Sequence, residues 1–103
     1  MPNRLQLKLS AVEDLAEAYA WYEKQRAGLG DEFLIAVARC LDAIERHPKS
    51  NAIALKDVRR GLLKRFPYSV FYYVDGELII VRAIFHHSRQ PSRWKQRLRP
   101  EGD

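Results

Sequence analysis

Polar and apolar residues alternate strictly at the start of the chain. The leucines at every second position, Leu5, Leu7 and Leu9, are separated by polar side chains. A period of two predicts a half-buried β-strand, because successive side chains of a strand point to opposite faces. These leucines require an apolar neighbour, so we expect the strand to join the sheet that later segments form.

Apolar residues then recur three and four positions apart, which predicts an amphipathic helix that ends near Gln25. The residues expected on its buried face are Val12, Leu15, Tyr19 and Tyr22. Ser10 and Glu13 match a capping box, in which the Ser10 hydroxyl accepts a hydrogen bond from the backbone N–H of Glu13. Gly28 and Gly30 are expected to end the helix, since glycine readily adopts the left-handed conformation.

A second helical pattern follows a short link, which predicts an antiparallel helical hairpin. Asp31 is the expected N-cap, and Pro48 is expected to stop the helix. One face of this helix is apolar and consists of Phe33, Val37, Leu41 and Ile44. Residues 47–57 are predicted to be a connecting loop.

Three strands are predicted in the second half of the chain, over residues 58–64, 68–74 and 77–85. Asp75-Gly76 between two apolar runs predicts a hairpin turn with positive φ at both residues. Pro67 is expected in the preceding turn, because it has no N–H to donate to a sheet. Arg82 interrupts the last strand and is expected to reach solvent, an anion or a carboxylate.

Together these elements predict an α+β fold over a single domain, residues 1–103. An N-terminal strand is followed by the antiparallel helical hairpin and then by a three-stranded antiparallel meander. Pro91-Ser92 is the expected start of a short C-terminal helix from Arg93 to Leu98. Longer apolar runs that would cross a bilayer are absent from the sequence.

The composition and the charge distribution indicate in which cellular compartment the protein works and what kind of partner it meets. Apolar residues make up 47% of the 103 residues, which excludes an intrinsically disordered chain. The single cysteine, Cys40, fits the reducing cytoplasm. Residues 53–103 carry eleven Lys and Arg against five Asp and Glu, whereas residues 1–52 carry seven against eight. This asymmetry predicts one cationic face that meets nucleic acid or an acidic protein, or else a basic surface without a partner.

The candidate chemistry lies around the adjacent histidines His86 and His87. As neighbours on a strand they point to opposite faces and cannot chelate one metal ion, so we expect neither a metal nor a cofactor. A histidine together with arginines suits metal-free RNA cleavage, and it equally suits phosphate binding without reaction. The third reading is structural, with one histidine satisfied in the core. Tyr68 and Tyr72 share a face and either stack on bases or pack in the core.

Five segments of the chain resemble, in the same order, the RelE/ParE superfamily of bacterial type II toxin–antitoxin toxins. They are WYE at 21–23, GLGDEF at 28–33, the helix end at 44–48, VRRGLLKRFPYSVFY at 58–72 and HHSRQPSRW at 86–94. The resemblance implies a helical hairpin against an antiparallel sheet. It also implies a growth-inhibiting toxin that a cognate antitoxin neutralises.

Two activities occur among proteins that this chain resembles. RelE-like toxins are ribosome-dependent mRNA endonucleases, and for that activity the resemblance implies catalytic roles for His86 and Arg89. The arginine that RelE-like toxins carry on the third strand falls on Ser69 here, so Arg65 or Arg60 would have to replace it. ParE-like toxins instead poison DNA gyrase and are not enzymes of this kind.

The pattern of His86, Arg89 and Pro91, followed by Trp94, is the more ParE-like, so we favour gyrase inhibition. The expected contacts to the target are Arg60, Arg65, Tyr68, His87, Arg89, Arg93 and Trp94. We expect Arg60, Arg65 and Arg89 to form one cationic rim beside His86. The expected partners are a cognate antitoxin and either gyrase or the ribosome with mRNA, without a membrane. A homodimer and a heterotetramer with the antitoxin are both compatible with the sequence.

Overall fold

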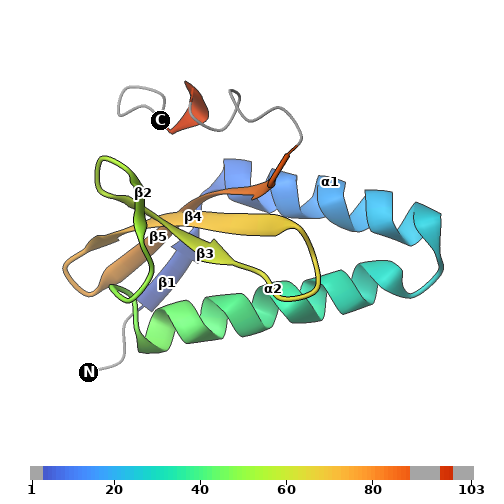
Figure 1. Cartoon of the computed structure of the whole chain (residues 1–103), viewed down its shortest axis with the longest axis horizontal. Helices are drawn as coiled ribbons and strands as arrows, with labels where there is room; N and C mark the ends of the chain where they lie inside the picture. The colour runs from blue at the N-terminus through green and yellow to red at the C-terminus, as the bar shows by residue number, and fades with distance from the viewer. Residues whose placement is uncertain (1–3, 89–95, 99–103) are drawn as a thin grey trace.

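The computed structural model of the protein describes residues 4–88 and 96–98. Its elements, in chain order, are β1 (Arg4–Leu7), α1 (Leu9–Gln25), α2 (Leu29–Arg46), β2 (Ile53–Leu55), β3 (Val58–Leu62), β4 (Tyr68–Asp75) and β5 (Leu78–His86). Figure 1 shows α1 and α2 as a hairpin in which the chain reverses direction. The α+β class and the helical hairpin predicted from the sequence are confirmed.

The strands form one five-stranded mixed sheet in the order β1-β5-β4-β3-β2. The predicted meander is the antiparallel centre of this sheet, and β1 joins it at one edge, parallel to β5. The prediction of a loop over residues 47–57 is wrong in part, because Ile53 and Leu55 pair with β3 as a second edge strand. The left-handed backbone of Lys56, with φ 54, makes the tight turn between β2 and β3.

The N-terminal strand is shorter than its alternating pattern. Leu5 and Leu7 pair with β5 as expected, but Leu9 already begins α1 and is 72% exposed. The predicted capping box is therefore wrong, since Lys8 occupies the N-cap position. The Ser10 hydroxyl instead donates a hydrogen bond of 3.1 Å to the carbonyl oxygen of Arg82 on β5.

The hairpin between β4 and β5 turns one residue later than predicted. Asp75 pairs with Leu78 as the last rung of the ladder, so the two turn residues are Gly76 and Glu77. Gly76 has φ 64, and a glycine at the first turn position is the usual solution for such hairpins. The earlier turn before Tyr68 lies where it was predicted and contains Pro67.

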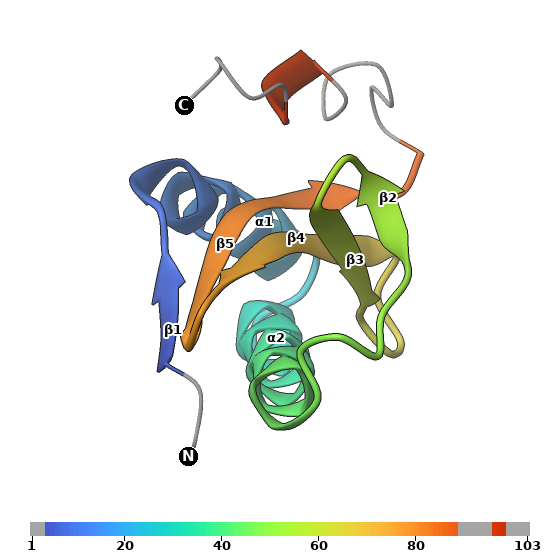
Figure 2. The ribbon, with the colours of Figure 1, turned by 90° about the vertical axis from the view of Figure 1, so that its left-hand side faces the viewer.

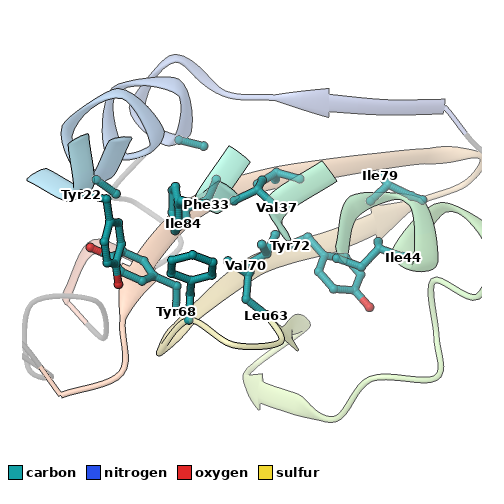
Figure 3. Packing of buried hydrophobic residues seen from close by; sticks show 14 residues of the cluster. Tyr22, Phe33, Val37, Ile44, Leu63, Tyr68, Val70, Tyr72, Ile79 and Ile84 are labelled. Atoms are coloured by element: carbon teal, nitrogen blue, oxygen red, sulfur yellow. The ribbon is translucent and has the colours of Figure 1, made fainter. Parts of the chain in front are cut away.

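Both helices cover the same face of the sheet, as Figure 2 shows for α2 beneath β4 and β5. The centre of this core is aromatic. The ring centroids of Tyr22 and Phe33 lie 5.0 to 5.9 Å from each other and from those of Phe66 and Tyr68. Figure 3 shows Tyr22, Phe33 and Tyr68 grouped at one end of the core. Ile44 and Tyr72 lie at the other end. Core packing rather than base stacking is therefore the role of the Tyr72 ring, which is fully buried.

The buried face of α2 is as predicted, but that of α1 is rotated. Val12 is 45% exposed, and the buried residues of α1 are Ala11, Ala18 and Tyr22. Small alanine side chains allow the helix to approach the edge of β5 closely, where Asp14 accepts a hydrogen bond of 3.0 Å from the backbone N–H of Ile84. Large residues at positions 11 and 18 would prevent this approach.

The opposite face of the sheet carries a smaller apolar cluster of Val58, Phe71, Ala83 and Leu98. Figures 1 and 2 place the short C-terminal segment that contains Leu98 on this side of the sheet, opposite α2. The helix predicted from Arg93 to Leu98 falls largely outside the described residues, of which 96–98 form a short helical turn.

The link between the helices explains two of the motifs in the sequence. Glu23 at the end of α1 accepts hydrogen bonds of 2.9 Å from the backbone N–H groups of Gly28 and Gly30, at the start of α2. A Cβ at position 30 would lie 2.6 Å from the Tyr19 ring, so only glycine fits there. Asp31 lies in the first turn of α2 and is not its N-cap as predicted, because the helix begins after Gly28.

Replacing Glu23 with alanine is expected to lower the free energy of unfolding by about 1–2 kcal/mol, since two helix N–H groups lose their acceptor. Thermal or urea unfolding measures the change. The control is Lys24→Ala on the exposed side of the same turn, with an expected change below about 0.5 kcal/mol. Equal stability of the two variants would show that Glu23 does not cap α2.

Candidate functional site

The candidate residues gather at one end of the sheet, where β5 ends and β4 begins. His86, the last residue of β5, lies opposite Tyr68 in the ladder, and their rings are in edge contact with centroids 5.2 Å apart. Both line a hollow of about 400 Å³ between α1 and the end of β5. Trp21 and Lys24 come to this hollow from α1.

A hydrogen bond from the backbone of Ser88 sets the tautomer of neutral His86. The backbone N–H of Ser88 donates a hydrogen bond of 3.1 Å to Nδ1 of His86. A backbone amide can only donate, so Nδ1 is an acceptor and the neutral imidazole carries its proton on Nε2. In this state His86 is a hydrogen-bond donor through Nε2, and a general base at that atom would need the other tautomer.

His87 does not share this environment. Its backbone N–H donates to the carbonyl oxygen of Pro67 at 2.8 Å, and its side chain does not line the hollow that contains His86. Its Nε2 atom is buried and has no hydrogen-bond partner among the described residues. The two neighbouring histidines are therefore not a pair that acts on one group.

Arg60 lies on the face of the sheet that the helices do not cover. Its Nε donates a hydrogen bond of 2.9 Å to the Ser69 hydroxyl, and its guanidinium lies 5.7 Å from the centre of the Phe71 ring. Ser69 is fully buried. The guanidinium of Arg60 thus covers the position at which the third-strand arginine of RelE-like toxins was expected.

Arg65 lies in the turn between β3 and β4, with φ 73, and turns toward α2. It forms an ion pair of 2.9 Å with Glu32, which a second arginine, Arg26, contacts at 3.3 Å. Hydrogen bonds from Arg65, and then from Arg26, lower the pKa of the Glu32 carboxyl group. The guanidinium of Arg65 is therefore paired with a carboxylate of the protein itself.

The expected single cationic rim of Arg60, Arg65 and His86 is wrong. The pleat places Arg60 with Phe71 on the uncovered face, whereas His86 lies in the hollow beside α1. Glu32 draws Arg65 toward α2. Tyr68 is 4% exposed, so its ring has no free face for a base and only borders the hollow. The predicted contacts Arg89, Arg93 and Trp94 lie outside the described residues.

Arg82 was expected to reach solvent, an anion or a carboxylate, and its side chain is not directed into solvent. It is 6% exposed, and its guanidinium donates to the carbonyl oxygens of Leu98 at 3.1 Å and Arg97 at 3.2 Å. Arg82 is the extra residue of a β-bulge in β5, because Ala83 and Val81 pair with consecutive residues of β4.

Sequence reasoning also missed the carboxylate that joins these segments. Asp14 receives two hydrogen bonds from Arg97, at 2.7 and 3.1 Å, and a third from the N–H of Ile84. The Arg97 guanidinium also lies 4.7 Å from the centre of the Phe85 ring. This network ties α1, β5 and the C-terminal turn together. The two partners are 83 positions apart, so no local pattern reveals the pair.

Cys40 lies on α2 in a second hollow, and burial raises the pKa of its thiol to about 11. Alkylation at pH 8 is therefore expected to be about 200-fold slower than in the urea-unfolded chain, whose thiol ionises near 8.5. Iodoacetamide labelling followed by mass spectrometry measures both rates. Rates within tenfold of each other would contradict burial of the thiol in the folded protein.

Within the described part of the chain, no group of three or more His, Cys, Asp or Glu residues is arranged to hold a metal ion. The same part contains no helix whose length and apolar character would carry it across a membrane.

Three solved structures with the same fold come from toxin–antitoxin systems. The chromosomal ParDE system of P. aeruginosa matches with a TM-score of 0.73 at 19% identity, over 82% of this chain and 95% of that one. The isolated E. coli RelE toxin matches with 0.62 at 14% identity, over 91% and 94%. The RelBE2 complex of Mycobacterium tuberculosis matches with 0.60 at 17% identity, over 84% and 99%. At 14–19% identity this likeness shows a shared fold.

The sequence also matches the model of one protein family. The model described as the ParE toxin of the type II toxin–antitoxin system parDE matches residues 5–91, which is most of the chain. The protein therefore belongs to the ParE toxin family. No curated protein matches the sequence significantly.

Proposed function

We propose that this toxin stops growth by poisoning DNA gyrase, as ParE-like toxins do, and that a cognate antitoxin neutralises it. The observation that carries the proposal is the match to the ParE toxin family over residues 5–91. The complexes among the structural neighbours support an antitoxin as partner. Gyrase is a cytoplasmic enzyme, so the proposed site of action is the cytoplasm, with residues 1–103 acting as one domain.

The contacts of the basic residues support binding rather than catalysis. Phosphodiester cleavage needs cations that are available to the transition state and a base in the correct tautomer. Here Arg65 is held by Glu32, Arg82 by backbone carbonyls, and Nδ1 of His86 by the N–H of Ser88. The contacts of Arg82 and His86 would have to rearrange before each reaction, whereas the exposed pair of Arg65 with Glu32 would cost little to break.

A supercoiling assay with purified protein and gyrase tests the proposal. We expect micromolar toxin to block supercoiling and to trap cleaved plasmid, and we expect prior addition of the antitoxin to restore activity. Phe33→Ala, which removes the centre of the core, serves as the inactive control. Unchanged supercoiling at a micromolar excess of toxin over gyrase would refute gyrase as the target.

The second candidate function is ribosome-dependent mRNA cleavage. It is favoured by the Arg60 guanidinium at Ser69 and by His86 in its hollow beside Lys24. Primer extension on translated mRNA would then show cuts in the ribosomal A site, and His86→Ala or Arg89→Ala would abolish them. Cuts that persist in both variants would exclude these two residues as the catalytic site.

A further inference from the structure

The hollow between α1 and the end of β5 combines an apolar floor with a partly exposed tryptophan. Ala18 of α1 and Ile84 of β5 form the floor, and Trp21 stands beside them. Trp21 is 45% exposed, while its ring packs edge-on against the buried ring of Tyr22 with the centroids 5.1 Å apart. A tryptophan held in this way beside a concave apolar floor is typical of the residues that dominate the affinity of protein interfaces.

Two oppositely charged side chains flank Trp21 along α1. Glu17 lies four residues before it and Lys24 three residues after it, so all three share one face of the helix and line the hollow. This spacing separates the two charges by about 10 Å along the helix axis. Both side chains are exposed, and within residues 4–88 and 96–98 neither forms an ion pair. The hollow therefore presents a negative and a positive group on either side of an aromatic ring.

The other carboxylate of the hollow is neutralised within the protein. Asp14 forms an ion pair of 2.7 Å with Arg97 and accepts a hydrogen bond of 3.0 Å from the N–H of Ile84. Its side chain is 10% exposed, so a partner in the hollow meets the charge of Glu17 and not that of Asp14. Glu17 disfavours a nucleic acid as the occupant, because a phosphate backbone requires cations along its contact. A protein segment with side chains of both signs is the better complement.

We infer that this hollow is the surface through which the toxin contacts gyrase. A segment of gyrase places an apolar side chain on the floor against Trp21. An acidic side chain of the segment lies next to Lys24, and a basic one lies next to Glu17. The identity of the partner rests on the proposed function, whereas the location and the chemistry of the contact rest on the hollow.

Binding to intact gyrase, measured by biolayer interferometry together with inhibition of supercoiling, tests the inference. Trp21→Ala is expected to weaken binding by about tenfold or more, because it removes the aromatic anchor. Trp21→Phe keeps an aromatic ring and should lose no more than about threefold. Lys24→Glu sets a like charge against the acidic side chain of gyrase and should weaken binding by about tenfold.

Two variants outside the hollow are the matched controls. Leu9→Ala removes a 72% exposed apolar side chain from the same helix, and Arg39→Glu reverses an exposed charge on α2. Both should bind gyrase within about twofold of wild type. Thermal unfolding of each variant verifies that it is folded, and the exposed Lys24→Glu keeps the test decisive if Trp21→Ala is unstable.

Photo-crosslinking locates the contact directly. Benzoylphenylalanine, a photoreactive amino acid, is expected to crosslink to gyrase when it replaces Trp21 but not when it replaces Leu9. Mass spectrometry of the crosslinked peptide should identify a gyrase segment in which an apolar side chain lies between an acidic and a basic one. A crosslink from position 9 alone would place the contact on another face of α1 and overturn the inference.

Failure of the hollow and failure of the proposed function give different results. A wild-type toxin that inhibits gyrase, with Trp21→Ala and Lys24→Glu equally potent, would overturn the hollow while leaving gyrase as the target. A loss in Trp21→Ala without a loss in Lys24→Glu would overturn the acidic chemistry of the gyrase segment. A wild-type toxin that neither binds gyrase nor inhibits supercoiling would refute the proposed function and this contact with it.

Discussion

Replacing Asp14 with alanine is expected to lower the free energy of unfolding by about 3 kcal/mol. The Asp14 carboxylate accepts hydrogen bonds from the backbone of Ile84 and from both terminal nitrogens of Arg97. The side chains of Asp14 and Arg97 are 10% and 27% exposed, so water replaces few of these contacts. The variant leaves the strand N–H of Ile84 without its acceptor and removes the carboxylate from the Arg97 guanidinium, which keeps only the carbonyl oxygen of Arg82.

Two further variants make this prediction specific, with urea unfolding as the measurement. Asp14→Asn keeps an acceptor for Ile84 but loses the charge, and we expect roughly half of the alanine effect. Glu13→Ala changes an exposed neighbour on the same helix and should cost less than about 0.5 kcal/mol. A loss for Asp14→Ala no larger than that of Glu13→Ala would mean that this carboxylate does not hold α1 on the edge of β5.

Phe33→Ala is expected to lower the free energy of unfolding by about 4 kcal/mol, because it opens a cavity in the aromatic core. Phe33 is fully buried, and its ring lies 5.0 to 5.4 Å from those of Tyr22, Phe66 and Tyr68. For a domain of this size the midpoint of thermal unfolding should fall by about 20 °C.

The adjacent residue provides the control for this change. Leu34 is 36% exposed, so Leu34→Ala should cost about 1 kcal/mol or less. Phe33→Leu refills part of the cavity and should lie between the two. Calorimetry on the three variants measures the order, and a smaller loss for Phe33→Ala than for Leu34→Ala would contradict the position of the core.

Periodicity was a sufficient guide wherever an element buries one regular face. Leu5 and Leu7 of the first alternation, the stripe that begins at Phe33 and the apolar run within β5 lie in the elements that they predicted. Such patterns are local, and burial of the face that they define dominates the energy. The resemblance in the segments from Trp21 onward likewise led to the family that the family model shows.

The failures share a physical cause, which is stabilisation by contacts with other elements that the pattern within one segment does not show. β2 is three residues long and exists through its pairing with β3. Ala11 and Ala18 are buried because α1 lies close to β5, and alanine carries little signal in a hydrophobic pattern. Arg82 finds its acceptors at residues 97 and 98, beyond the reach of any local motif.

The candidate site was the least predictable part of the molecule. Residues 53–103 carry an excess of positive charge, but this count does not indicate on which face of the sheet each arginine lies. The pleat places Arg60 on the face opposite the helices, and Glu32 on α2 holds Arg65. The bond from Ser88 that fixes the His86 tautomer depends on the backbone after β5, which side-chain identity alone does not specify.

The central claim, gyrase as the target, is tested most directly by inducing the toxin in growing bacteria without its antitoxin. Plasmid topology and incorporation of labelled amino acids are followed in the same culture. Our account predicts that negative supercoiling is lost, with broken DNA, before protein synthesis declines. An immediate arrest of translation while plasmids remain fully supercoiled would contradict it and would point to the ribosome.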